Sequence, residues 1–488
     1  MSKEVRSLEP HALWSHFADL NAVPRPSKKE ERVIQFMVDF GNKLGLETLV
    51  DRIGNVIIKK PATPGMENRQ TVILQSHLDM VHQKNGDTQF DFDNQGIEMI
   101  VDGDWVKANG TTLGADNGIG VAAIMAVLSA KGEDVKHPAI EALFTIDEET
   151  GMTGAMELDP AHLSGSILLN LDTEDDDELS IGCAGGIDTN TTQTYQEIPT
   201  PADSVAYVLK LRGLKGGHSG MDIDKGRGNA NKLMNRLLYD MDDRFALHIA
   251  SIDGGSLRNA IPRESTAVII IPASNTEAFE ASFKERTNEI LKEYHAIEPD
   301  LRILSEKTVA PAMVMEPKAQ RTFVNAIYSL HNGVYRMSPD IAGLVETSSS
   351  LARVIVKEGK IVTQSLQRSS VESSKMDVAN TIRTTFENAG ATVVQEGDYP
   401  GWQPNPDSPI LGVMGNLYKD IFKGNPDVKA CHAGLECGIL GKHLPDTDMI
   451  SFGPNIRHAH SPDECVQISS VQKFWSFLLS TLEEIPSI

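Results

Sequence analysis

Residues 71–79 read TVILQSHLD, a short apolar run that ends in a histidine and an aspartate. The run 71–75 has too few polar positions to alternate between a wet and a dry face, so it is predicted to be a strand buried on both faces of a sheet. His77 and Asp79 are two positions apart, and on an extended chain their side chains project to the same face. The end of this strand therefore presents an imidazole and a carboxylate together.

Other strand patterns end in the same kinds of residue. Three further apolar runs lead into acidic or histidine side chains: 140–146 into Glu148 and Glu149, 166–171 into Asp172, and 449–453 into His458 and His460. Ligands collect outside the carboxyl ends of the strands in open α/β sheets. We therefore expect these side chains to gather at one edge of a sheet.

Helices are predicted between these strands. Residues 29–44 carry apolar positions at helical spacing, and residues 118–130 follow Asp116 and Asn117, whose side chains suit a helix N-terminus. Strands that alternate with helices predict an α/β fold with a mainly parallel sheet.

The middle of the chain follows another pattern. Residues 187–398 divide into two halves of strands and helices, each typical of an antiparallel layer, so we expect an inserted α+β domain there. The Gly-rich stretch 182–186 and the Pro-rich stretch 399–409 are interpreted as turns where the chain crosses between domains. The outer domain is then discontinuous, comprising residues 1–186 and 399–488.

The composition indicates a folded, acidic protein. The chain has 488 residues, 40% of them hydrophobic, and 45 Lys and Arg against 68 Asp and Glu give a net charge of −23. This charge repels a phosphate backbone, so no nucleic-acid partner is expected. No apolar run approaches the roughly 20 residues that span a bilayer, and no apolar signal core is seen, so we expect no membrane partner. The four cysteines form no CxxC pair, which favours reduced thiols and a cytoplasmic location.

So many carboxylates at one edge need compensation, because like charges held close together cannot all ionise cheaply. Divalent cations remove that cost, and a mixture of His and carboxylate ligands suits Zn²⁺, or Mn²⁺ or Co²⁺ as substitutes. Taken singly, each residue has an ordinary alternative: His77 a structural histidine, Asp116 a helix N-cap, and Glu148 with Glu149 a solvated pair. Their joint occurrence at strand ends favours a catalytic metal site, and one shared carboxylate would hold two ions.

Seven motifs carry a resemblance to a known family: HLD at 77–79, GADNGIG at 114–120, DEETG at 147–151, NLD at 170–172, GGHSG at 216–220, HAGLECG at 432–438 and HAHSPDE at 458–464. With them the chain resembles the di-zinc metallopeptidases related to carboxypeptidase G, aminoacylase and carnosinase. GADNG, GGHSGMDI and HAGLECG are similar to the dipeptidase branch of that family. The resemblance implies a catalytic domain with two Zn²⁺ ions per subunit and an inserted lid or dimerisation domain.

The resemblance also implies a role for each matching residue at the metal site. Asp116 resembles the carboxylate that bridges the two ions. The other ligands are implied to be His77 with Asp172 on one ion, and Glu149 with His460 on the other. Asp79 resembles the residue that orients the His77 ring, and Glu148 resembles the general base.

Substrate contacts are implied by the same resemblance. His218 resembles the histidine that stabilises the oxyanion, reaching across from the partner subunit of a homodimer. Asn259 resembles a substrate-contacting asparagine, and Arg368 is a candidate for binding the substrate's C-terminal carboxylate, since a guanidinium can bind it bidentately. Glu436 is a weaker candidate for the substrate's amino group.

The expected activity is therefore hydrolysis of unblocked dipeptides, with Xaa-His dipeptides included. A related deacylase would share every metal ligand and differ only in its substrate pocket. A non-catalytic metal-binding scaffold is the third possibility. The presence of both Glu148 and Asp79 argues against it, because a pure binder needs ligands but no base.

Overall fold

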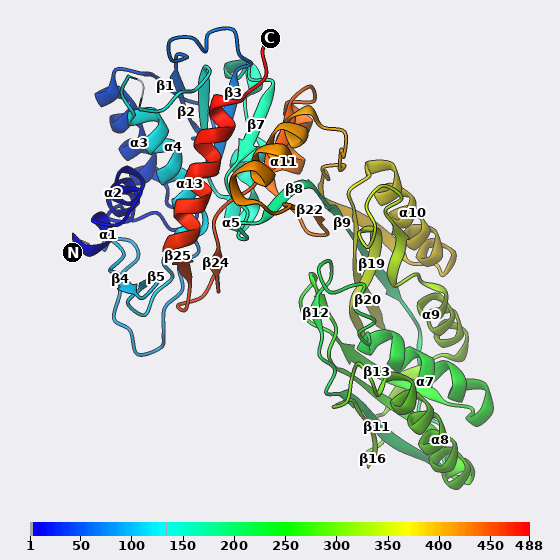
Figure 1. Cartoon of the computed structure of the whole chain (residues 1–488). Helices are drawn as coiled ribbons and strands as arrows, with labels where there is room; N and C mark the ends of the chain where they lie inside the picture. Colours follow the sequence, from blue (N-terminus) through cyan, green and yellow to red (C-terminus); the bar gives the residue numbers. More distant parts are fainter. Residues whose placement is uncertain (1–2, 133) are drawn as a thin grey trace. The chain divides into compact units, whose positions relative to one another are not determined.

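In the computed structural model, which describes residues 3–132 and 134–488, the chain divides into two compact units (Figure 1). The first unit takes the chain up to Gly182, then Pro404–Ala430 and Leu435–Ile488; the second comprises Cys183–Gln403 and Cys431–Gly434. The sequence-based boundaries at 186/187 and 398/399 differ from these. The difference arises because Gly186 and Tyr399 already pair within the sheet of the second unit, and the carbonyls of Cys431 and Ala433 accept the Ala184 N–H.

The first unit is built on an eight-stranded sheet. Its strands are, in spatial order, β1 (Glu47–Val50), β2 (Val56–Lys60), β6 (Ile140–Thr145), β3 (Val72–His77), β7 (Ile167–Asn170), β23 (Asp448–Ser451), β8 (Glu178–Cys183) and β22 (Asp427–Cys431). The central strands β6, β3, β7 and β23 pair in parallel, which confirms the predicted α/β class. The pairs β1–β2, β2–β6 and β23–β8 are antiparallel. Every residue of β3, β6 and β7 is buried.

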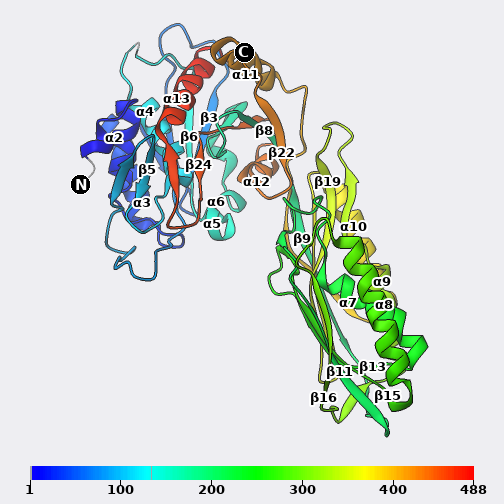
Figure 2. The same ribbon diagram turned by 60° about the horizontal axis from the view of Figure 1, so that its bottom comes forward.

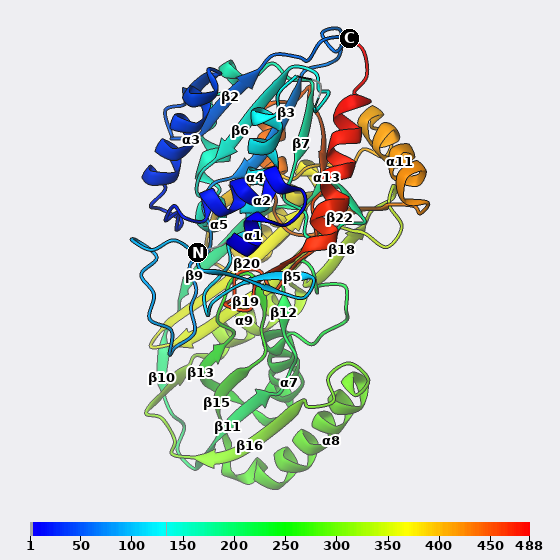
Figure 3. The same ribbon diagram turned by 60° about the vertical axis from the view of Figure 1, so that its left-hand side comes forward.

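Helices of the first unit pack on this sheet or on one another. They include α2 (His11–Leu20), α3 (Glu31–Leu44), α4 (Ala115–Ser129), α11 (Pro409–Phe422), α12 (Glu436–His443) and α13 (Ile468–Glu483). Helix α4 is apolar all round and buried along its length, as expected for a helix between the sheet and α2. Helix α3 is amphipathic and ends at Gly45, which takes the left-handed conformation. Figure 3 shows α11 beside α13.

A small sheet fixes the loop that precedes α4. Its order is β24 (Ile456–Arg457), β25 (Cys465–Gln467), β5 (Trp105–Ala108) and β4 (Met99–Asp102), all antiparallel (Figure 2). The pairing of β25 with β5 brings the segment between β24 and β25 next to the loop after β5. Two motifs more than 300 residues apart in sequence, GADNGIG and HAHSPDE, become neighbours through this pairing.

The second unit is a nine-stranded antiparallel sheet. The main path is β16 (Arg302–Thr308), β11 (Ser204–Arg212), β15 (Ser265–Pro272), β13 (His248–Gly254), β19 (Val345–Lys357), β20 (Lys360–Ser369), β9 (Gly185–Thr194) and β21 (Thr392–Tyr399), and β18 (Gly333–Met337) pairs with β19. The β13–β19 pairing joins the two predicted halves into one sheet. Helices α7 (Ala230–Phe245), α8 (Thr276–Tyr294), α9 (Pro317–Ser329) and α10 (Glu372–Asn388) bury their apolar faces in one core against it.

The Gly-rich stretch 182–186 is not the turn that the sequence predicted. Strand β8 runs to Cys183 and β9 begins at Gly185, so only Ala184 separates them. The glycines here serve close packing: a Cβ on Gly185 would lie 2.4 Å from the Gly401 nitrogen and the Tyr399 oxygen. Across residues 3–132 and 134–488, the helices are all too short or too polar to cross a bilayer.

Candidate active site

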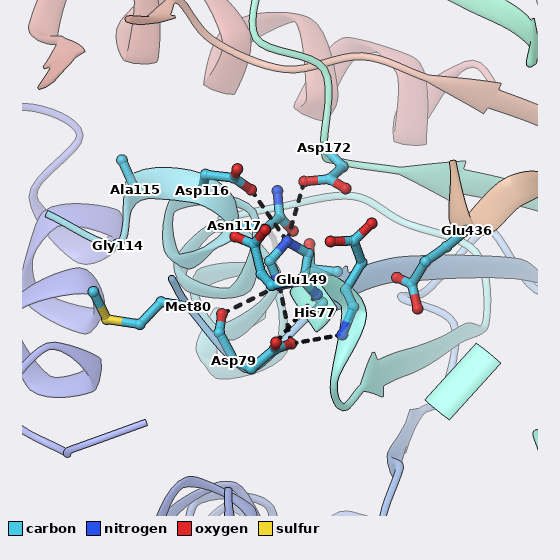
Figure 4. A network of polar contacts seen from close by, with 12 residues as sticks. His77, Asp79, Met80, Gly114, Ala115, Asp116, Asn117, Glu149, Asp172 and Glu436 are labelled. Carbon is cyan, nitrogen blue, oxygen red and sulfur yellow. Dashed lines mark hydrogen bonds and ion pairs between the residues drawn. The ribbon is translucent and has the colours of Figure 1, made fainter. Parts of the chain in front are cut away.

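The predicted strand-end residues of the first unit meet at one edge of its sheet. His77 is the last residue of β3, Asp172 follows β7, and Glu149 lies in the short helix α5 (Glu148–Gly151) after β6. Asp116 lies in the first turn of α4, where Asp116 and Asn117 depart from helical φ/ψ. The close view in Figure 4 shows His77, Asp116, Glu149 and Asp172 converging. With His460 we call these five residues the strand-end cluster.

Asp116 stands between two histidines. Its Oδ1 lies 3.1 Å from His77 Nε2, and its Oδ2 lies 3.1 Å from His460 Nε2. His77 Nε2 is also 3.6 Å from Asp172 Oδ1, and His460 Nε2 is 2.9 Å from Glu149 Oε2. Two triads therefore form, each with ligand atoms within 4.8 Å of one another, and Asp116 is common to both.

The charges of this cluster are strongly coupled. Burial opposes a charge on His77, but Asp172, Asp116 and Asp79 raise its pKa well above the usual value. Hydrogen bonds to Asp116 and Glu149 raise the pKa of His460 to about 11. Burial, together with repulsion from Asp116 and Glu149, raises the pKa of Asp172 to about 6. These shifts show how strongly the imidazoles and the carboxylates of the cluster interact.

The donor set fits a pair of divalent metal ions. It combines two imidazoles with three carboxylates and contains no thiolate, which suits Zn²⁺, Mn²⁺ or Co²⁺. Glu149 Oε1 is buried without a hydrogen-bond partner, so one carboxylate oxygen of the cluster is unsatisfied. A metal ion would satisfy it.

Asp79 links the His77 ring to the glutamate turn. Its Oδ1 lies 3.4 Å from His77 Nδ1 and accepts the Glu148 N–H at 3.0 Å. Its Oδ2 accepts the Glu149 N–H at 3.3 Å and the Ser27 hydroxyl at 2.8 Å. The Asp79 carbonyl oxygen also lies 3.2 Å from His77 Nδ1, so Asp79 sets the ring orientation through both its backbone and its buried carboxylate, and the carboxylate positions the two glutamates.

Glu148 lies beside the cluster without sharing its hydrogen bonds. Burial raises its pKa well above the usual value, and the charges of Asp172, Glu436 and Glu149 add to this, while His77 opposes it. Glu436, at the start of α12, accepts from Gln75 at 2.7 Å and from Thr145 at 2.8 Å, and its Oε1 has no partner. Burial raises the pKa of Glu436 to about 7.

Two residues beneath the cluster have no metal role in the sequence-based prediction. Glu464, the last residue of HAHSPDE, accepts four backbone N–H groups, from Leu113, Gly114, Ala115 and Asp116, at 2.7–3.2 Å. Arg25 is 1% exposed and donates to the carbonyls of Leu78, Asp79 and Gly114. The HAHSPDE motif could have drawn attention to Glu464. Nothing in the sequence around Arg25 distinguishes it from an ordinary surface arginine.

The second unit contains a separate group of polar residues. His218 ends the short strand β12 (Gly217–His218), and its Nε2 lies 3.4 Å from Arg368 Nη2. Arg368 is 4% exposed and also donates to Tyr399 Oη at 2.9 Å and, at 3.4 Å, to Ser219 Oγ. We call His218, Ser219, Arg368 and Tyr399 the arginine cluster.

The arginine cluster is poor in acceptors. His218 Nδ1 accepts N–H bonds from Gly220 at 3.2 Å and Met221 at 3.0 Å, and burial and the charge of Arg368 lower the His218 pKa. A neutral ring that accepts at Nδ1 carries its hydrogen on Nε2. Within this unit, the described residues place no carboxylate in hydrogen-bond contact with Arg368. An anion is the ligand that this arrangement suits.

Asn259 and His432 flank the arginine cluster. Asn259 is exposed, and its carbonyl accepts the Ser219 N–H at 2.8 Å; the next residue, Ala260, pairs with His218. His432, from the HAGLECG motif, is buried and its Nε2 contacts Ser348 Oγ at 2.7 Å. Burial, with the charge of Arg368, lowers the pKa of His432 to about 3.

Comparisons with known proteins agree with these observations. The sequence model of the peptidase family M20/M25/M40 matches residues 73–484. A cytosol non-specific dipeptidase of Escherichia coli (strain K12) is 41% identical over 485 residues, which cover 99% of both chains. The structure of an aminoacylhistidine dipeptidase from Vibrio alginolyticus matches with a TM-score of 0.95 and 44% identity, over 100% of this chain and 99% of that chain. A tripeptidase from Staphylococcus aureus, at 15% identity and a TM-score of 0.57 over 98% of this chain and 99% of that chain, shares the fold.

We expect Glu464→Gln to weaken metal binding about 10- to 100-fold, the range typical of partners that support metal ligands. The amide would turn an N–H donor toward the N–H groups of the loop that carries Asp116. Competition with a chromophoric chelator measures the affinity. Glu483→Gln, which alters an exposed partner of Lys136, is the control and should bind metal normally. Unchanged affinity in Glu464→Gln would contradict a supporting role.

Proposed function

This chain belongs to the peptidase family M20/M25/M40, and from this premise we propose that it hydrolyses unblocked dipeptides, Xaa-His among them, with two Zn²⁺ ions per subunit. It is a metallopeptidase of the dipeptidase type. The proposal of two zinc ions rests on the position of Asp116, whose two carboxylate oxygens each lie 3.1 Å from a different histidine. Mn²⁺ or Co²⁺ would fit the same donors.

The proposed ligands follow from the two triads. Asp116 would contribute to both ions, His77 and Asp172 would complete the ligands of one, and Glu149 and His460 would complete those of the other. When bound, the ions lower the pKa of a water molecule and polarise the peptide carbonyl. Asp79 holds the His77 ring from its Nδ1 side, which keeps Nε2 turned toward the metal.

Glu148 is proposed as the general base. It takes a proton from the attacking water and later delivers it to the departing amine. Its backbone N–H is fixed by Asp79, so the carboxylate starts from a defined position. The environment that raises its pKa makes it a better proton acceptor than an exposed glutamate.

The arginine cluster is proposed to hold the rest of the substrate. Arg368 binds the C-terminal carboxylate, because no carboxylate among the described residues of its unit hydrogen-bonds its buried guanidinium. His218 donates its Nε2 hydrogen to the developing oxyanion of the scissile carbonyl. Asn259, exposed next to this pair, offers a further polar contact.

The dipeptidase proposal is tested with a panel of unblocked dipeptides, including Xaa-His, beside N-acyl amino acids. The purified protein is assayed as prepared, after chelation, and after zinc is returned. We expect cleavage of the free dipeptides that disappears on chelation and recovers with zinc. Cleavage of the acylated compounds alone would move the assignment to a deacylase, which would use the same ligands.

We expect Glu148→Gln to keep its metal content and to lose at least about 10²-fold in kcat, the lower end for a general acid–base group. Metal analysis and kinetics on the same preparation measure both. Glu157→Gln, which alters an exposed glutamate paired with Arg52, should behave as wild type. Near-normal turnover by Glu148→Gln would refute the role of Glu148 as general base. If neither wild type nor the variant cleaved dipeptides, the scaffold alternative would be favoured.

We further propose that the protein is a cytoplasmic homodimer in which His218 serves the partner subunit's site, as the family resemblance implies. If so, mixed subunits of the inactive variants His218→Ala and Glu148→Ala should recover partial activity. Because His218 and Arg368 lie 3.4 Å apart, they serve one substrate, and mixing His218→Ala with Arg368→Ala should recover none. No recovery in the first mixture, once mixed dimers are demonstrated, would assign His218 to its own subunit.

A further inference from the structure

Three residues of the second unit pair across three neighbouring strands of its sheet. Gly186 on β9 pairs on one side with Arg368 on β20 and on the other with Tyr399 on β21. Neighbouring strands lie about 4.8 Å apart, so the backbones of Arg368 and Tyr399 are separated by about two such spacings. Their side chains nevertheless meet above the middle strand, where Arg368 Nη1 donates to Tyr399 Oη at 2.9 Å.

The absence of a side chain at Gly186 makes this contact possible. A Cβ at this position would lie 2.6 Å from Tyr399 Oη and 2.7 Å from two carbon atoms of the ring. Real Cβ atoms do not approach other atoms so closely, so even alanine would displace the tyrosine. The φ of Gly186 is not left-handed. Glycine is therefore required at this position for the space it leaves above the strand.

The hydrogen bond from Arg368 to Tyr399 is shorter than the contacts of Arg368 with Ser219 and His218. The contact with Ser219 Oγ is 3.4 Å, at the outer limit of a hydrogen bond. The contact with His218 Nε2 is also 3.4 Å, and that nitrogen carries a hydrogen when Nδ1 accepts, so it cannot accept from the guanidinium. Tyr399 is itself fixed, because its carbonyl accepts from the buried ammonium group of Lys375 at 2.8 Å.

We propose that Tyr399, seated over Gly186, is the positioning residue that aims Arg368 at the substrate's carboxylate. This rests on the proposed role of Arg368 in carboxylate binding. With Nη1 engaged by Tyr399, Nη2 is turned toward His218 Nε2, so that two N–H donors lie side by side without an acceptor between them. Without the hydroxyl, the guanidinium would sample other rotamers, and ordering it again would oppose substrate binding.

The test uses Tyr399→Phe, which removes only the hydroxyl, and a dipeptide compared with its own C-terminal amide. Losing a hydrogen bond to a charged group is worth roughly tenfold or more, so we expect KM for the free dipeptide to rise about tenfold. We expect kcat to change less than about twofold and the amide to be cleaved as by wild type. Tyr207→Phe is the matched control, since its hydroxyl donates to Glu280 in the same unit.

Coupling to Arg368 separates positioning from general stability. In an Arg368→Gln background, Tyr399→Phe should cause no further rise in KM. Gly186→Ala should reproduce the defect with the hydroxyl still present, and thermal unfolding shows whether each variant is folded. A wild-type enzyme that cleaves the dipeptide and its amide equally well would overturn both the Arg368 assignment and this proposal. If wild type prefers the free dipeptide, an unchanged KM in folded Tyr399→Phe, or a full effect in the Arg368→Gln background, would overturn the role of Tyr399 alone.

Discussion

The mutual repulsion of carboxylates at the strand ends is the constraint on which the first unit depends. Two like charges 4 Å apart repel by about 4 kcal/mol at an effective dielectric constant of 20, and a whole domain is stable by only about 5–15 kcal/mol. Asp116, Asp172, Glu148 and Glu149 cannot all stay ionised in a buried edge without cations. The raised pKa values of His77 and His460 express this demand, because their protons balance part of the charge. Metal ions would meet the same demand with more charge in less volume.

Two charged residues that support the strand-end cluster, Glu464 and Arg25, are themselves buried. Glu464 spreads its negative charge over four backbone N–H groups, although burial still raises its pKa to about 6. Arg25 is buried, and desolvation lowers its pKa to about 10, so it stays charged at neutral pH. It donates to three carbonyls and to Asn21 rather than to a carboxylate. A Cβ on Gly114 would lie 2.6 Å from Arg25 Nη2, so this glycine is required both for its left-handed φ of 71° and for the close approach. The GADNG motif thus combines the aspartate shared by the two triads with a turn that packs around the buried Arg25 guanidinium.

How much of this could be predicted from the sequence depends on the range of the interactions. Local patterns sufficed for the central strands and for the strand-end position of His77, because a buried strand and its last residue are read within about ten positions. The resemblance, rather than spacing, distinguished Asp116 from an ordinary helix cap and His460 from His458. The carbonyl partners of Arg25 could not be predicted, since they lie 53 to 89 positions away in the sequence. The Gly-rich stretch 182–186 was misinterpreted for a related reason: glycine signals either a turn or a close approach, and only the pairing with β21 and β20 decides between them.

The buried carboxylates of the first unit favour a substrate with a free ammonium group over an acylated one. Two divalent ions would balance the four carboxylates Asp116, Asp172, Glu148 and Glu149. Glu174 and Glu436 remain, and burial, together with repulsion from neighbouring carboxylates, raises their pKa values to about 8 and about 7. In the arginine cluster, no carboxylate among the described residues of the unit hydrogen-bonds the buried Arg368 guanidinium, although its charge acts on the nearby carboxylate of Asp188. A free dipeptide carries an ammonium group and a carboxylate at opposite ends, whereas an N-acyl amino acid lacks the ammonium group. A free ammonium group would favour the ionised form of either glutamate, whereas the acylated compound supplies no such charge, and this physical difference favours the dipeptidase over the deacylase that would share its metal ligands.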